Sequence, residues 1–208
     1  MSDRAPDEAV ATPLDRLRAG NGRFLESLAG SADADAAVAA LAVAEPYAIV
    51  LGCADSRVPP ELVFDESIGR LFVVRVAAHV AASEELGTIE YAVARWNCPL
   101  LVVLGHTQCA AIAAAMEPPP PGAEPPPNLT ASIHLPLLLG SIRAGLGSAQ
   151  IDASADPWGD AVRVNVRRTI SQLSLWSMPI RRRVEAGQLA IVGAVYDVET
   201  GEAEFLDR

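Results

Sequence analysis

Three short segments rich in Val, Ile and Leu set the strongest limit on how this chain folds. They are YAIVLGC at residues 47–53, RLFVVRVA at 70–77 and CPLLVVLGH at 98–106, and each is bounded by Gly or Pro. Strands that are apolar throughout are buried on both faces, as in a parallel sheet covered by helices. Between the last two segments, residues 83–97 repeat apolar side chains at helical spacing. We therefore expect an α/β fold with a mostly parallel central β-sheet flanked by helices.

The chain is long enough for one well-filled core. Its 208 residues do not require more than one unit, so we treat residues 1–208 as a single domain. Within it, residues 1–12 are expected to be flexible. Residues 13–45 are expected to form an N-terminal helical arm, with a kink at the GNG sequence of residues 20–22.

The second half of the chain carries a proline-rich interruption. Residues 117–128 include two proline runs that cannot continue a helix, so this stretch is expected to form a surface loop. Residues 160–187 read as a long helix broken near Pro179. The chain then ends in a strand, a turn at the sequence ETGE and a second, edge strand.

Charge and cysteine content exclude several classes of partner. The formal net charge of -10 opposes binding to nucleic acid or to an anionic membrane, because both attract clustered basic side chains. The longest apolar runs are far shorter than the roughly 20 residues that span a bilayer. The first ten residues lack the pattern of a secretory signal, so we expect a cytoplasmic protein with reduced thiols. Of its three cysteines, Cys98 is expected to be a small core residue.

Metal-capable side chains follow two of the expected strands at the same point. Cys53 comes directly after Gly52, and His106 directly after Gly105, with Cys109 three residues later. The carboxyl ends of parallel strands share one edge of a sheet, so these side chains can converge there. Two thiolates and one imidazole suit Zn²⁺ and leave a fourth position open. A cysteine or a histidine at a strand end is often an ordinary core residue, but the neighbouring charged residues favour a zinc site.

Those charged residues are Asp55 and Arg57, which follow the first proposed ligand. On an extended turn they lie on one side, so the guanidinium can hold the carboxylate in a charge-assisted contact. The carboxylate then has two available roles. It can occupy the fourth zinc position, or it can accept a hydrogen bond from a zinc-bound hydroxide and orient it. The alternative without function is an ordinary salt bridge in a turn.

Several segments together resemble the β-class carbonic anhydrase family. The resemblance runs from about Leu14 to Leu206 and so covers nearly the whole chain. The segments that carry it are LRAGNGRF, CADSR, VPPELVFD, LFVVR, LGTIEYAV, LVVLGHTQC and LAIVGAVYDVETG. The pairing of Cys-x-Asp-Ser-Arg with His-x-x-Cys, in this order, is the most specific part of the match.

The resemblance implies an activity and a set of site residues. The reaction would be zinc-dependent, reversible hydration of carbon dioxide to bicarbonate and a proton by a zinc-bound hydroxide. Zinc would be held by Cys53, His106 and Cys109, with Asp55 and Arg57 as a catalytic pair. In the family, Asp55 can instead ligate the zinc in a closed state. A homodimer or a dimer of dimers is also implied, with the N-terminal arm wrapped around the partner.

Some family positions differ in this chain. Ala110 stands where the family usually has a glycine, directly after the second of the two zinc-binding cysteines. Its backbone N–H remains available to a bound oxyanion, so we assign Ala110 to substrate binding. A methyl group there makes a positive φ unfavourable. Ala78 also replaces a glycine. Ala44 and Val50 replace a substrate-side glutamine and a tryptophan that lines a regulatory bicarbonate pocket in some members, so we expect no such pocket here.

Two other functions remain open from the sequence. One keeps the zinc site but hydrolyses carbonyl sulfide or carbon disulfide, which relatives of this fold use as substrates. The other is a zinc-stabilised dimeric scaffold with little catalysis, whose proline-rich loop docks a partner. The presence of both Asp55 and Arg57 argues against the scaffold, because a structural zinc site needs its ligands but not this pair.

Overall fold

The computed structural model describes residues 12–30, 38, 43–117, 132–146 and 155–207. Its contacts divide the chain into two units, Met1–Ala44 and Glu45–Arg208. The predictions for residues 1–12 and 117–128 fall almost entirely outside the described residues. Among the described helices, none is both long enough and apolar enough to cross a membrane.

The first unit contains helix α1 (Pro13–Ala29), which lies within the predicted arm. Thr12 begins it with a capping box, in which its hydroxyl accepts from the Asp15 backbone N–H while the Asp15 carboxylate accepts from the Thr12 N–H. The kink predicted at residues 20–22 is wrong, because α1 runs through both glycines without a break. A helix tolerates interior glycines at a cost of about 1 kcal/mol each.

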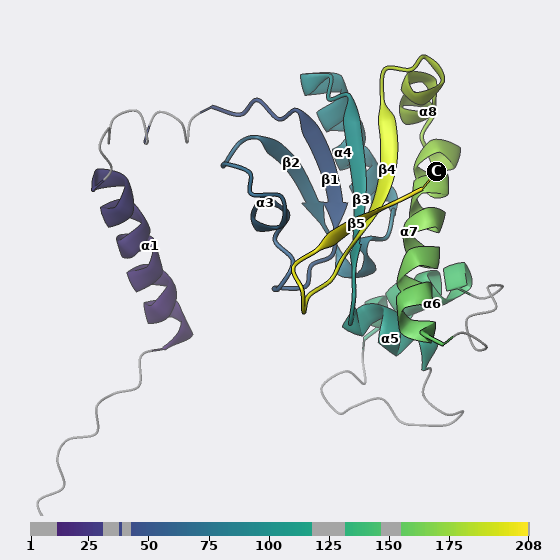
Figure 1. Cartoon of the computed structure of the whole chain (residues 1–208), viewed down its shortest axis with the longest axis horizontal. Coiled ribbons are helices and arrows are strands. Elements are labelled where there is room, and N and C mark those ends of the chain that lie inside the picture. Colours follow the sequence, from purple (N-terminus) through teal and green to yellow (C-terminus); the bar gives the residue numbers. More distant parts are fainter. Residues whose placement is uncertain (1–11, 31–37, 39–42, 118–131, 147–154, 208) are drawn as a thin grey trace, which may run out of the picture. The chain divides into compact units, whose positions relative to one another are not determined.

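The second unit is built on a five-stranded sheet in the order β2-β1-β3-β4-β5 (Figure 1). The first four strands are parallel to one another, and β5 pairs antiparallel with β4 at the edge. The α/β prediction, with a mostly parallel sheet, is confirmed. The strands are β1 (Ala48–Gly52), β2 (Leu71–Arg75), β3 (Leu100–His106), β4 (Ala190–Tyr196) and β5 (Ala203–Leu206).

Helices connect the strands and cover the sheet. They are α3 (Pro60–Val63), the 3-10 turn η1 (Ala77–His79), α4 (Ser83–Trp96), α5 (Ala110–Met116), α6 (His134–Leu146), α7 (Pro157–Trp176) and α8 (Met178–Glu185). The long helix predicted near the C-terminus is divided into α7 and α8. Ser177 lies between them and caps α8 by accepting the backbone N–H of Ile180.

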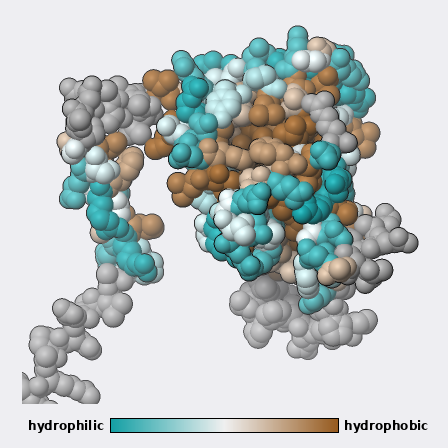
Figure 2. All heavy atoms as spheres, viewed as in Figure 1, coloured by the Kyte–Doolittle hydropathy of each residue, from teal (hydrophilic) through white to brown (hydrophobic). Residues whose placement is uncertain are grey.

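The two faces of the sheet pack differently. On one face, Ile49, Leu51 and Leu101 belong to a large core that includes buried side chains of α4 and α7. On the other, Val50 and Val102 belong to a smaller cluster. In Figure 2 the second unit presents a band of apolar side chains between polar surfaces. Buried continuous strands of this kind hold their carboxyl ends firmly in place, and those ends carry the candidate site.

Candidate metal centre

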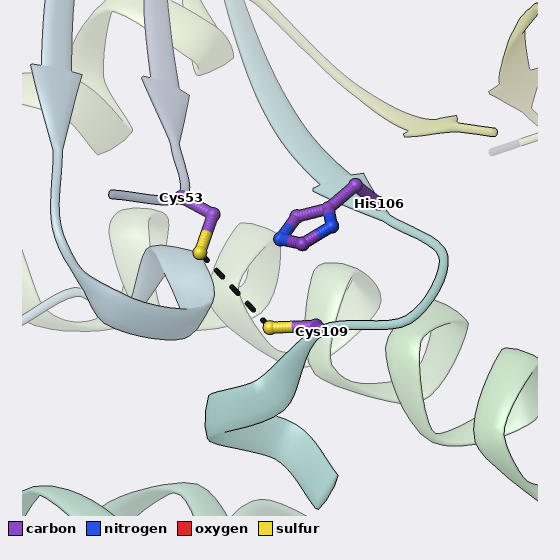
Figure 3. A group of neighbouring side chains, drawn as sticks. All are labelled: Cys53, His106 and Cys109. Atoms are coloured by element: carbon purple, nitrogen blue, oxygen red, sulfur yellow. Dashed lines mark hydrogen bonds between the residues drawn. The ribbon is translucent and has the colours of Figure 1, made fainter. Parts of the chain in front are cut away.

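Cys53, His106 and Cys109 meet at the carboxyl end of the sheet (Figure 3). One ligand atom from each residue lies within 4.8 Å of the others, and all three residues are buried. The two sulfur atoms are 4.0 Å apart. This is the convergence that the strand ends predicted.

The strand pairing explains why these residues meet. β1 and β3 are neighbours in register, so Cys53, just after β1, lies beside the end of β3, where His106 is the last residue. Gly105 allows β3 to approach α7, because a Cβ there would come within 2.7 Å of the Val166 side chain. The loop after β3 then turns through Gln108, whose φ is 56°. Cys109 is the N-cap residue of α5 and faces back toward Cys53.

The histidine is prepared to act as a ligand. The Nδ1 atom of His106 lies 2.8 Å from the carbonyl oxygen of Thr107, to which it donates its proton. The Nε2 atom therefore carries a free lone pair, and it is buried without a hydrogen-bond partner. A buried orphan acceptor beside two thiols fits a metal ion. Tetrahedral zinc with Zn–S bonds of about 2.3 Å places two sulfurs roughly 3.8 Å apart, close to the 4.0 Å observed.

Hydrogen bonding makes one thiol far more acidic than the other. The Cys109 thiol, with smaller contributions from the nearby His106 side chain and from the backbone N–H groups of Asp55 and Ala78, stabilises the Cys53 thiolate and holds the pKa of Cys53 well below its ordinary value. The same contact raises the pKa of Cys109 well above its ordinary value. Without a metal ion the two sulfurs therefore share one proton at neutral pH.

This shared proton predicts a pH dependence of zinc binding. A metal ion needs both sulfurs as thiolates, so binding expels the proton held by Cys109. Zinc affinity should therefore rise as pH rises, and about one thiol proton should be released per zinc bound at neutral pH. Calorimetric titrations in buffers of different ionisation enthalpy measure the proton count. A count of zero would show that both thiols are already ionised.

Asp55 and Arg57 form a bidentate pair next to these three residues. The Arg57 Nε atom donates to Asp55 Oδ1 over 3.0 Å, and Nη2 donates to Oδ2 over 2.8 Å. The Arg57 backbone N–H also donates to Oδ1, over 2.9 Å. The guanidinium holds the pKa of the Asp55 carboxyl well below its usual range. In this arrangement Asp55 is turned toward Arg57, and the group of metal-capable side chains found among the described residues does not include it.

Three more side chains support the site, and none of them was predicted from the sequence. Arg75, at the end of β2, donates from Nε to the Cys53 carbonyl oxygen over 2.8 Å and from Nη2 to the Asp55 carbonyl oxygen. Gln108 accepts from Arg57, and Glu199 accepts from Gln108. Two of them had a sequence signal, since Arg75 ends an expected strand and Gln108 lies between the predicted ligands His106 and Cys109.

The alanines that replace family glycines behave differently from each other. Ala78 is fully buried and has a φ of 54°, a backbone conformation that strains alanine but not glycine. Ala110 begins α5 and is not among the positive-φ residues. The concern about positive φ at Ala110 therefore does not apply. Beside Ala78, the buried His79 contacts Asn165 through Nε2 over 3.0 Å, and burial lowers the pKa of His79 to about 4.

Comparison with known proteins agrees with this geometry. A family model described as carbonic anhydrase matches residues 48–203. Carbonic anhydrase 2 of Mycobacterium tuberculosis is 37% identical over 199 residues, covering 92% of this chain and 90% of that protein. A carbonic anhydrase of Mycolicibacterium smegmatis is 36% identical over 193 residues, covering 90% and 89%.

Solved structures show the same fold. The β-carbonic anhydrase of Coccomyxa, in complex with acetazolamide, superposes with a TM-score of 0.75 at 25% identity, covering 96% of this chain and 87% of that one. A β-carbonic anhydrase of Aspergillus fumigatus superposes with a TM-score of 0.77 at 24% identity, covering 94% and 91%. The family match spans most of the chain and the resemblance in the sequence is confirmed. This protein belongs to the carbonic anhydrase family, in its β class.

Proposed function

We propose that Cys53, His106 and Cys109 hold the zinc ion of this carbonic anhydrase and that Asp55 and Arg57 act beside it in catalysis. The reaction is the reversible hydration of carbon dioxide to bicarbonate and a proton. The observation that carries this assignment is the buried, unpartnered Nε2 atom of His106, which faces two thiols. Zinc, when bound, lowers the pKa of water toward about 7 and so supplies hydroxide near neutral pH.

Asp55 is suited to orient the attacking oxygen. Its depressed pKa keeps it ionised, so it accepts hydrogen bonds and does not donate them. The Oδ1 atom already accepts two hydrogen bonds from Arg57, whereas Oδ2 accepts one and keeps acceptor capacity. Arg57 also keeps the carboxylate from turning toward the metal position, which is the rearrangement that a closed state with Asp55 as a ligand requires.

The backbone N–H of Ala110 is the proposed contact for the oxygen that becomes negatively charged in the product. Ala110 is the first residue of α5, and its N-cap, Cys109, makes no side-chain capping hydrogen bond. The amide groups at a helix start lack partners within the helix and favour anions. The methyl group of Ala110 takes no part in this contact, because only the backbone N–H donates.

We also propose that the protein is a homodimer or a dimer of dimers in the cytoplasm. A structure from Sordaria macrospora with the same fold, at a TM-score of 0.65 and 23% identity, is described as a tetrameric β-carbonic anhydrase. Helix α1 buries none of its residues, and Leu14, Leu17 and Leu25 are all more than half exposed. The three cysteines are free, as is usual in a reducing compartment.

Stopped-flow measurement of carbon dioxide hydration by the zinc-loaded protein tests the function. The rate should exceed that of buffer and should climb from neutral to alkaline pH, because the nucleophile forms only after a water proton is lost. Two thiolates make zinc a weaker electrophile than three imidazoles do, which moves the rise toward alkaline pH. A zinc-loaded protein with no rate above buffer at any pH would contradict the proposal. Hydrolysis of carbonyl sulfide in its place would identify another substrate.

A further inference from the structure

The Asp55–Arg57 pair continues outward through two more side chains. Arg57 donates from Nη1 to the Gln108 side-chain oxygen over 3.3 Å and from Nη2 to the Gln108 backbone oxygen over 3.2 Å. The Gln108 side-chain nitrogen, Nε2, donates to Glu199 Oε1 over 2.6 Å. These contacts join residues that are 51 and 91 positions apart in the sequence.

Glu199 is held firmly although it is exposed. It lies in the turn between β4 and β5, where the Asp197 carboxylate accepts the backbone N–H groups of Glu199 and Thr200 over 2.7 and 3.2 Å. The turn is fastened to the loop that carries Gln108, because the Val198 N–H donates to the Thr107 hydroxyl over 3.1 Å. The Glu199 carboxylate therefore faces Gln108 from a turn that is held in place.

The chemistry of an amide makes this contact directional. A glutamine side chain has a donor end and an acceptor end, and a carboxylate only accepts. By taking the NH₂ end of Gln108, Glu199 turns the oxygen end toward Arg57. That oxygen and the backbone oxygen of Gln108 then occupy the outer nitrogens of the guanidinium. The other side of the guanidinium faces Asp55, where Nε donates to Oδ1 and Nη2 donates to Oδ2.

We propose that Glu199 is a positioning residue for catalysis, acting through Gln108 to hold Arg57 in its bidentate contact with Asp55. This inference rests on the proposed roles of Asp55 and Arg57. The side chain of Arg57 is 46% exposed, so without this support it is free to leave the carboxylate for water. Asp55 would then lose its fixed orientation toward the attacking oxygen.

Three variants test the proposal by stopped-flow kinetics on zinc-loaded protein. Glu199→Ala should lower kcat/KM by about three- to tenfold, less than the 10- to 100-fold typical of direct supporting contacts, with zinc content unchanged. Glu199→Gln keeps an acceptor of the same length but adds a donor end that can turn Gln108 the other way, so it should restore only part of the loss. Glu202→Ala removes an exposed carboxylate from the same turn and should match the wild type. Equal rates for Glu199→Ala and Glu202→Ala would overturn the proposal.

A double-mutant cycle tests whether Glu199 acts through Gln108. In a Gln108→Ala background, adding Glu199→Ala should change kcat/KM no further, because the link to Arg57 is already missing. Additive losses would show that Glu199 acts by another route. If the wild type itself has no hydration activity, the proposed function fails, whereas an active wild type with an unaffected Glu199→Ala variant rejects this inference alone.

Nuclear magnetic resonance supplies a readout that does not depend on turnover. The chain has 16 arginines and no lysine, so the spectrum of arginine Nε–H groups holds at most 16 signals, and an Arg57→Lys variant assigns the Arg57 signal. In zinc-free and zinc-loaded protein, Glu199→Ala should speed exchange of the Arg57 Nε proton with water, while Glu202→Ala should not. Unchanged exchange in Glu199→Ala would contradict the positioning role.

Discussion

Replacing Cys53 with alanine should abolish both zinc binding and carbon dioxide hydration. The variant removes the more acidic of the two thiols and leaves His106 and Cys109 as a two-ligand site. Zinc affinity should fall by well over the 100-fold that loss of a supporting residue costs, so that purified protein holds far less than one zinc per chain. Metal analysis by mass spectrometry measures the content, and stopped-flow kinetics should return the rate of buffer alone.

Cys98 offers a matched control for this experiment. It is also a buried free cysteine, but its thiol donates to the Pro46 carbonyl oxygen over 3.2 Å and lies outside the metal-capable group. Cys98→Ala should keep zinc and activity, with at most a loss of stability of about 1 kcal/mol from the missing contacts. Stoichiometric zinc in a folded Cys53→Ala protein would show that Cys53 is not a ligand. Circular dichroism of both variants separates loss of the ligand from loss of the fold.

The sequence was sufficient to predict that Cys53, His106 and Cys109 lie close together, because the ends of apolar strands are easy to locate. A glycine that closes an apolar run comes directly before Cys53 and before His106, and parallel strands bring such positions to one edge of the sheet. The order of the strands in the sheet was harder to predict from the sequence. That β1 lies directly beside β3 depends on packing between distant segments, yet this neighbourhood is what brings Cys53 within reach of His106.

Local backbone conformation marks the limit of prediction from sequence. Glycine is common where φ is positive, so the two alanines that replace family glycines, Ala78 and Ala110, could not be told apart from the sequence. Only Ala78 has a positive φ, whereas Ala110 is helical. The contact between Gln108 and Glu199 depends on a φ of 56° at Gln108 and on the turn after β4, and no spacing rule connects the two. Likewise, α1 continues through residues 20–22 because two interior glycines weaken a helix without forcing it to end.

The second large effect is expected for Asp55→Asn, which should leave zinc in place while lowering kcat/KM by about 100- to 1,000-fold. Asparagine has nearly the same shape, so the loop after β1 and its hydrogen bond to the Arg57 backbone can persist. The change removes the negative charge that holds Arg57 and replaces one acceptor oxygen with a donor. The attacking oxygen then loses the partner that orients it.

An exposed carboxylate ten residues later in the chain provides the control for this variant. Asp65→Asn changes the same charge at a position where φ is 49°, a conformation that asparagine adopts readily, and should leave the rate unchanged. A rate equal to the wild type in zinc-loaded Asp55→Asn would remove Asp55 from the mechanism and reduce its pairing with Arg57 to a turn salt bridge. Loss of zinc together with activity would instead make Asp55 part of the metal site. Retained zinc with a large loss of rate is the outcome expected for a carboxylate that acts on the attacking oxygen without binding the metal.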